Sequence, residues 1–215
     1  MWQCIELHAR ARRALCNTSR HWFLSGFPAA LLLNGCAVTP TLETWQSPTA
    51  TQYSDWQFTG RVSLVQEEQG WHAGISWQEH GDRFQLQISG PLGQEAFRLT
   101  GNAAGVILED KKGKKTSARD ANSLLLQTTG WSLPVNGLRY WVRGLVVPGE
   151  KARERRDLQG RLLELEQSGW SINYSRYHFV DDLGWPAKLQ LVRDDVSVRL
   201  VIDKWRPGMS AGPGM

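Results

Sequence analysis

Cysteine is scarce in this chain. Its 215 residues contain three, Cys4, Cys16 and Cys36, and all lie within the first 36 positions. If the chain is cut immediately before Cys36, the remainder keeps one thiol, at its first residue. Such a chain cannot form an internal disulfide or a cysteine-rich metal site. Its folded part must therefore be stable through an apolar core, which about 180 residues can supply.

A large excess of charge of one sign is also lacking. The whole chain has a formal net charge of +4, and from Cys36 onward 21 Lys and Arg stand against 20 Asp and Glu. Nucleic-acid binding would call for a concentrated basic surface. The composition therefore gives no case for a nucleic-acid partner.

Catalytic and metal-binding patterns are missing too. The three histidines after Cys36, His72, His80 and His178, show no metal-ligand spacing such as H-E-x-x-H, and there is no phosphate-binding loop pattern. Residues 208–212 match the G-x-S-x-G pattern of hydrolases. That motif needs a strand before it and its acid and histidine after it, which this position does not offer. We therefore expect no enzyme activity, no cofactor and no metal.

No apolar run is long enough to span a membrane. The apolar segment at 22–33 has about a dozen residues, whereas a span needs roughly 20. Four arginines precede it and Leu33-Asn34-Gly35-Cys36 closes it. A basic region, an apolar region and a small residue in this order are typical of a secretory signal. The alternative is that Cys36 is a small buried residue of the fold.

The residues around Cys36 fit the bacterial lipobox, although Asn34 stands where Ala or Ser is usual. They predict that residues 1–35 are a lipoprotein signal peptide. Cys36 then carries the S-diacylglycerol and the N-acyl chain. Ala37 follows Cys36, in place of the aspartate associated with inner-membrane retention, which favours the outer membrane.

The segment 36–54 is rich in Ser, Thr and Pro, and we expect a lipidated N-terminus followed by a flexible tether of roughly 20 Å. Its one tryptophan, Trp45, is expected to dock on the domain edge in preference to a separate role.

Residues 55–205 show repeated period-two alternation of apolar and polar side chains, which indicates short antiparallel strands. The runs begin at residues 56, 71 and 84 and return after the middle of the chain, ending at 196–202. One apolar face per strand over this length favours a mainly β domain, curved into a barrel or half-barrel. Residues 206–215, with two Pro-Gly steps, are expected to form a disordered tail.

The middle of the chain predicts two helices. Asp120 is placed to cap the first, which contains Leu124 and Leu125, and Gly130 to end it. Asn136 is expected to cap the second, and Gly144 to end it. Its apolar face is formed by Leu138, Trp141, Val142 and Leu145. The helices are expected to cover one mouth of the sheet, over a packed core or over a pocket for an apolar ligand, and spacing does not decide between them.

Four segments carry a resemblance to a known family. They are Gly60-Arg61-Val62-Ser63-Leu64, residues 83–93 (RFQLQISGPLG), residues 138–145 (LRYWVRGL) and residues 198–205 (VRLVIDKW). In this order and after a lipobox, they resemble the LolB family of outer-membrane lipoprotein receptors. The likeness covers about residues 55–205.

The resemblance implies an unclosed antiparallel barrel of about 11 strands with a small helical lid over a hydrophobic cavity. It implies a receptor, expected to be a monomer, that accepts acylated lipoproteins from the periplasmic carrier LolA and inserts them into the outer membrane, where it is anchored by its lipid on the periplasmic face. The candidate cavity and lid residues are Trp71, Trp77, Phe84, Leu86, Leu124, Leu125, Trp141 and Trp170.

Two alternatives remain open: a lipid-anchored protein that binds another apolar ligand, and a structural lipoprotein with a packed core. A concave face filled by the protein's own tryptophans and leucines would speak against a carrier.

Leu92 is the candidate membrane contact. Gly90-Pro91-Leu92-Gly93 lies between two alternating runs, and Pro91 at the second turn position places Leu92 at the tip. The alternative is that Leu92 folds back onto the sheet. The resemblance matches it to the protruding leucine by which the family touches the membrane, with Pro91 and Gly93 beside it.

Two basic features are weaker candidates. Lys111–Lys115 is expected to be a solvated hairpin turn, with anionic head groups or an acidic carrier surface as alternative partners. Arg61 is expected to form a surface ion pair, with a carboxylate or lipid phosphate as the alternative.

Overall fold

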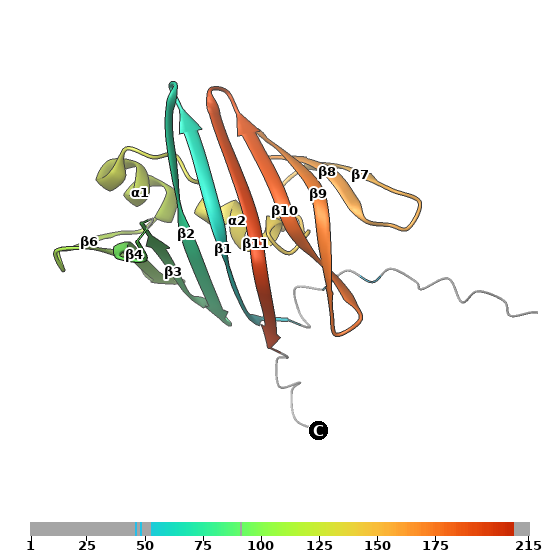
Figure 1. Ribbon diagram of the computed structural model, residues 1–215, viewed down its shortest axis with the longest axis horizontal. Coiled ribbons are helices and arrows are strands. Elements are labelled where there is room, and N and C mark those ends of the chain that lie inside the picture. Colours follow the sequence, from blue (N-terminus) through green and yellow to red (C-terminus); the bar gives the residue numbers. More distant parts are fainter. Residues whose placement is uncertain (1–45, 47, 49–52, 91, 209–215) are drawn as a thin grey trace, which may run out of the picture. The chain divides into compact units, whose positions relative to one another are not determined.

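An open antiparallel sheet dominates the described part of the chain (Figure 1). The computed structural model describes residues 46, 48, 53–90 and 92–208. Its strands are β1 (Asp55–Gln66), β2 (Gln69–His80), β3 (Arg83–Ser89), β4 (Glu95–Asn102), β5 (Gly105–Asp110), β6 (Lys115–Ala118), β7 (Ala152–Arg156), β8 (Leu162–Gln167), β9 (Trp170–Val180), β10 (Leu183–Arg193) and β11 (Val196–Gly208).

The strand order is β6-β5-β4-β3-β2-β1-β11-β10-β9-β8-β7. The first and last strands of the domain therefore pair at the centre of the sheet, and β6 and β7 lie at its two ends. Because the end strands do not pair with each other, the barrel is unclosed. The predicted mainly β fold of about 11 strands is confirmed.

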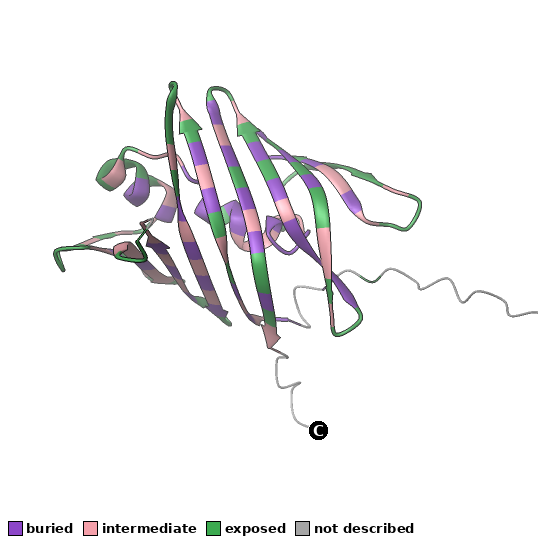
Figure 2. Ribbon diagram, in the orientation of Figure 1, coloured by how far each residue is buried: buried purple, intermediate pink, exposed green. Residues whose placement is uncertain are grey.

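Alternating burial gives the sheet one apolar face, which we call the inner face (Figure 2). In β1, for example, Trp56, Phe58, Val62 and Leu64 are buried while their neighbours are partly or fully exposed. The same period-two pattern continues in β2, β3, β9 and β11. Burying this face supplies the main stabilisation of a domain that has no disulfide to depend on.

A bulge at Thr59/Gly60 shifts the register between β1 and β11. A Cβ atom at Gly60 would lie 2.2 Å from the carbonyl oxygen of Val201, so only glycine permits the approach of the two strands. The bulge lets two long central strands bend around the inner face.

The structure has two helices in its described part, α1 (Ala121–Thr129) and α2 (Val135–Trp141). In Figure 1, α2 lies behind β1 and β11, and α1 lies to the left of β2. Asp120 caps α1 by accepting a hydrogen bond from Ser123 N, and Gly130 ends it in the left-handed conformation, both as predicted. Neither helix of the described chain is long and apolar enough to cross a membrane.

The predicted cap of α2 is wrong. Pro134 holds the N-cap position, and Asn136 is inside the helix, where its side-chain amide donates to Asp120 Oδ2 at 2.6 Å. Pro134 fits the start of a helix because it has no N–H to satisfy. Gly144 lies beyond the last helical residue, with φ at 72°, and donates to the carbonyl of Trp141.

Both predicted domain edges need adjustment. Pro48 and Tyr53 are buried, and Gln46 accepts a hydrogen bond from Gly184 N at 3.0 Å, so the end of the predicted tether packs on the domain. At the other edge, β11 continues to Gly208, which pairs with Asp55, so the predicted tail begins too early. Cys36, Trp45 and residues 209–215 lie outside the described residues.

The edge strands β6 and β7 were not predicted. Every residue of β7 is exposed, so it carries no alternation to detect. The turn between β5 and β6 contains Lys111–Lys114, as expected, and Asp110 Oδ1 holds it by accepting from Lys112 N and Lys114 N.

Candidate functional site

An aromatic cluster occupies the inner face of the central strands. Trp56, Phe58 and Trp77 come from β1 and β2, and Trp185 and Trp205 from β10 and β11. Ring centroids lie 4.8 Å apart for Trp185 and Trp205, and 5.2 Å for Phe58 and Trp205. Aromatic pairs at such distances stabilise a fold by more than the burial of their apolar area alone. Around these five residues the inner face is filled by the protein's own side chains, an arrangement that speaks against a preformed cavity at this place.

Helix α2 inserts Trp141 into this face. The Trp141 ring folds back over its own helix, where a Cβ atom at Gly137 would come within 2.4 Å of it. Glycine costs about 1 kcal/mol in a helix, and here it makes room for the largest side chain of the lid. Trp141 is only 1% exposed.

Gln167 of β8 fixes the end of α2. Its Oε1 accepts from Trp141 Nε1 at 2.9 Å and from Val147 N at 2.8 Å, and its Nε2 donates to Val147 O at 3.0 Å. Tyr174 of β9 donates to the carbonyl of Trp141 at 3.0 Å. These bonds satisfy polar groups that would be costly to leave unpaired in an apolar interior.

Glu79 of β2 fixes the other side of α2. It is buried, and it accepts from Arg139 Nε at 2.6 Å and from Trp77 Nε1 at 3.0 Å. Burial raises the pKa of Glu79, and the bonds from Arg139 and Trp77 only partly offset this. Because the folded-state pKa is the higher one, the contribution of Glu79 to stability is present below pH 4.5 and is lost as the pH rises through the folded-state value.

Arg143 follows α2 and is also buried, which lowers its pKa. It donates to Tyr53 O at 3.2 Å and lies over the ring of Trp56, 5.4 Å from its centroid. The segment before β1 is thus tied to the lid.

Helix α1 and the loop after it are held by fewer polar contacts with the sheet. Ser132 N donates to Gln66 Oε1 at 3.1 Å, and Arg193 donates to Ser132 Oγ at 3.1 Å. Trp131 stacks on Trp71 at 6.2 Å. A cavity of about 160 Å³ lies beside this loop, with Trp170 and Leu126 in its lining. Leu126 is 48% exposed.

The predicted cavity and lid residues all come together on the inner face or on the side of the lid that faces it. Seven are buried, and Trp71 is half-buried at the edge of the lid; the buried ones are Trp77, Phe84, Leu86, Leu124, Leu125, Trp141 and Trp170. Sequence reasoning missed Trp185, Glu79 and Gln167. Trp185 lies in a run, Leu183–Ala187, that is buried throughout and so lacks alternation.

The β3–β4 turn presents Leu92 to solvent at 93% exposure, so it does not fold back onto the sheet. Gly93 N donates to Gly90 O at 2.9 Å, and Gly90 N donates to Gln94 O at 2.9 Å. Gly93 has φ at 79°, a conformation that favours glycine. The described residues of this turn hold a large apolar side chain away from the core. Pro91 lies outside the described residues.

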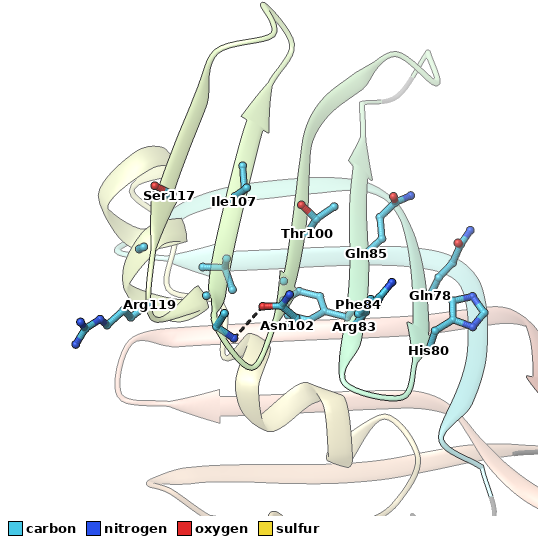
Figure 3. A pocket seen from close by; sticks show the side chains of 15 residues that line it. Gln78, His80, Arg83, Phe84, Gln85, Thr100, Asn102, Ile107, Ser117 and Arg119 are labelled. Carbon is cyan, nitrogen blue, oxygen red and sulfur yellow. Dashed lines mark hydrogen bonds between the residues drawn. The ribbon is translucent and has the colours of Figure 1, made fainter.

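Two of the hollows in the described chain lie on the outer face around β2 and β3. The larger, about 810 Å³, follows a row of outward-facing residues across β2 to β6, formed by Gln78, Gln85, Thr100, Ile107 and Ser117 (Figure 3). Its lining mixes polar side chains with apolar ones such as Phe84 and Val106. The second, about 440 Å³, lies beside the β3–β4 turn.

Two further sequence predictions concern Arg61 and metal binding. Arg61 forms the expected surface ion pair, with Asp203 at 2.7 Å. Within the described ranges, no three His, Cys, Asp or Glu side chains come together as a metal site would require.

An open antiparallel half-barrel with a two-helix lid over its apolar face defines a class of fold that is found among solved structures. This chain is similar to a LolA superfamily protein from Nitrosomonas europaea, with a TM-score of 0.51 and 7% identity over 73% of this chain and 88% of that one. A putative outer membrane lipoprotein-sorting protein domain from Vibrio parahaemolyticus gives a TM-score of 0.51 and 9% identity, over 75% and 87%. At these identities the likeness shows the fold alone.

Sequence relatives show the family. The family model "Outer membrane lipoprotein LolB" matches residues 54–205. Outer-membrane lipoprotein LolB of Francisella tularensis (strain FSC 198) is 32% identical over 81% of this chain and 88% of its own length. The LolB proteins of Nitrosococcus oceani and Pseudomonas paraeruginosa are 37% and 35% identical, over 77% and 83% of this chain and 84% and 93% of theirs.

The chain belongs to the LolB family. It is a lipid-anchored outer-membrane protein with a lipoprotein receptor role in outer-membrane lipoprotein localisation.

Proposed function

We propose that this protein accepts acylated lipoproteins from a LolA-type carrier, holds their acyl chains between the lid and the inner face, and releases them into the outer membrane without covalent catalysis. The observation that carries this is the apolar inner face of an open sheet beneath a two-helix lid. Hand-over needs no nucleotide, because cargo moves toward whichever site binds it more tightly.

Acyl chains must displace side chains that now fill the inner face. The α1 side of the lid is the place for this, because Ser132 is held by two hydrogen bonds and Trp131 by one ring stack. Helix α2 is fixed by Glu79 and Gln167 on opposite sides. Burying acyl chains contributes about 0.8 kcal/mol per methylene, which offsets the cost of opening such contacts.

Two indole groups on the inner face support a polar contact to the cargo. Trp56 Nε1 and Trp185 Nε1 are buried and have no hydrogen-bond acceptor among the described residues. A buried donor without an acceptor is costly. The ester carbonyl oxygens that join acyl chains to glycerol are acceptors of the right kind, so these indoles are suited to hold the polar end of the lipid.

Leu92 is the proposed membrane contact during release, with Pro91 and Gly93 beside it. Burying one leucine is worth about 1.5–3 kcal/mol, which is far less than the acyl chains proposed on Cys36 contribute. Leu92 is therefore unnecessary for anchoring. Its proposed task is to bring the edge of the sheet to the bilayer when cargo leaves.

A transfer assay tests the proposal. An acylated lipoprotein bound to the carrier is mixed with the intact protein, and the cargo is followed by co-purification. Movement of cargo to this protein is the expected result. A cargo that stays on a carrier shown to be competent with a known receptor would reject the proposal.

A further inference from the structure

The hollow beside the β3–β4 turn is built from small residues on the outer face. Ser63, Gly74 and Ser89 come from β1, β2 and β3, and Gly90 and Gly93 of the turn complete its edge. Its volume, about 440 Å³, lies within the roughly 300–1,000 Å³ that small-ligand sites occupy.

Packing does not require this hollow. A Cβ atom at Gly74 would lie 3.7 Å from Ser89 Cβ, which is ordinary contact, so a side chain would fit there. Valine and threonine are favoured in strands over glycine. The space above Gly74 is thus room left open beside the turn.

The lining of the hollow is basic. It contains Arg61, His72 and Arg199 and no Asp or Glu among its described residues. Arg199 and His72 flank Ser63, because both pair with it from the neighbouring strands. Arg61 is neutralised by Asp203. Arg199 is exposed, and none of the described residues forms an ion pair or hydrogen bond with it. An unpaired guanidinium presents the planar set of donors that matches a phosphate group.

The position of the hollow indicates where that phosphate comes from. Gly90 and Gly93 line it and flank Leu92, which is 93% exposed. The polar layer on each side of a bilayer is only about 5–8 Å thick. If Leu92 enters the acyl region, the groups beside its turn lie at the depth of the head groups.

We propose that this hollow binds the phosphate of a phospholipid head group through Arg199, with His72 and Arg61 beside it, while Leu92 is inserted in the bilayer. The proposal rests on the membrane contact of Leu92 proposed above. Leucine insertion alone fixes depth, and a second contact to a head group fixes the orientation of the domain on the membrane. The site therefore sets which way the lid and inner face point during release.

The direct test is an NMR titration of the intact, 15N-labelled acylated protein in micelles of an uncharged detergent. The probe is glycerophosphoglycerol, the phosphatidylglycerol head group without acyl chains, so the inner face does not compete for it. Saturable shifts of the amides of Gly74, Ser89 and Gly90 are expected. Inorganic phosphate is titrated in parallel, and so is the carrier.

Variants separate charge from space. Arg199→Gln should weaken head-group binding about 10-fold, the effect of one charge-assisted hydrogen bond. Gly74→Val keeps every charge and should abolish binding by filling the hollow. Arg206→Gln is the matched control, because Arg206 is an exposed arginine on the same strand, about 20 Å away, and should leave binding unchanged.

The release rate of cargo into vesicles completes the test. With vesicles of phosphatidylcholine and phosphatidylglycerol, Arg199→Gln and Gly74→Val should slow release several-fold and Arg206→Gln should not. Inorganic phosphate that binds as tightly as the head group, together with unchanged release by the two variants, would identify a free-phosphate site and overturn the proposal. If the amides of the hollow shift when the carrier is added but not when the head-group probe is added, the proposal is overturned. The hollow would then bind an acidic surface of the carrier.

The two measurements distinguish the head-group site from the proposed receptor function. Normal transfer from the carrier without head-group binding rejects only this site. Head-group binding without transfer rejects the receptor role and leaves the site.

Discussion

Single buried polar residues decide how the lid is attached. Gln167 is 3% exposed and is bonded to both Trp141 and Val147, while Glu79 is 4% exposed and is bonded to Arg139 and Trp77. Each lies on an otherwise apolar face, where an unpaired polar group costs about 1–3 kcal/mol. Their positions make α2 the fixed part of the lid.

Gln167→Leu should lower the free energy of unfolding by about 2–3 kcal/mol, because it leaves Trp141 Nε1 buried without a partner and removes both hydrogen bonds to the half-buried Val147. Gln190→Leu makes the same change at an exposed position of β10 and should alter stability by less than about 0.5 kcal/mol. Urea unfolding measures both. Equal effects of the two substitutions would show that the Gln167 bonds do not hold the lid.

Leu92→Glu should leave acceptance of cargo unchanged and slow its release into vesicles, because a carboxylate at the tip of the turn resists entry into the acyl region. Leu158→Glu, at another fully exposed leucine, is the control. Release is measured as cargo that floats with the vesicles. Equal release by the Leu92 variant and the wild type would remove Leu92 from the mechanism.

At the scale of elements, the two lid helices differ in how they are held. α2 is tied to β2, β8 and β9 by side chains in the interior. α1 depends on its cap, on the buried Leu124 and Leu125, and on the contacts of Trp131 and Ser132. Local opening is expected where buried contacts are few.

Asp120→Ala should cost about 1 kcal/mol of stability at neutral pH through loss of the α1 cap. Burial tends to raise the pKa of Asp120, but hydrogen bonds from Ser123 and Asn136 more than offset this, and the pKa is lowered. Its contribution is therefore present above pH 3.8 and is lost as the pH falls through the lower folded-state value. Asp120→Asn keeps a capping side chain and should remove this acid-induced loss. If the stabilities of the wild type and Asp120→Asn fell equally as the pH is lowered, the acid-induced loss would not come from Asp120.

Trp131→Ala should increase hydrogen exchange in α1 while leaving α2 protected, because it removes the stack on Trp71 at the edge of the lid. Leu158→Ala, in an exposed turn, should change neither helix. Mass spectrometry of peptides from each helix gives the readout. Uniform deprotection of both helices would show that the lid opens as one unit.

For the whole molecule, the sequence predicts the mainly β architecture well because most strands bury one face. In β1, for example, the signal is the alternation of the buried Trp56, Phe58, Val62 and Leu64 with less buried neighbours. The same signal is missing from β7, which is exposed throughout, and from Leu183–Ala187, which is buried throughout. The order that brings β1 beside β11 depends on contacts far apart in the sequence, and no local pattern predicts it.

The site was predictable in part for a similar reason. Apolar residues of the lid and inner face follow from periodicity. The exposed position of Leu92 follows from its turn only together with the family resemblance. The bonds of Glu79 and Gln167 join elements distant in the sequence, so neither residue carries a local pattern. The hollow at Arg199 likewise exists only once four strands lie side by side.

The central claim is that cargo acyl chains lie between the lid and the inner face. A carrier-bound lipoprotein with a photoreactive diazirine on an acyl chain is transferred to the intact protein, irradiated, and the cross-linked peptides are sequenced. The account predicts cross-links to inner-face and lid residues such as Trp77, Leu86 and Leu125. Cross-links confined to outer-face residues such as Gln85 and Arg199 would contradict it.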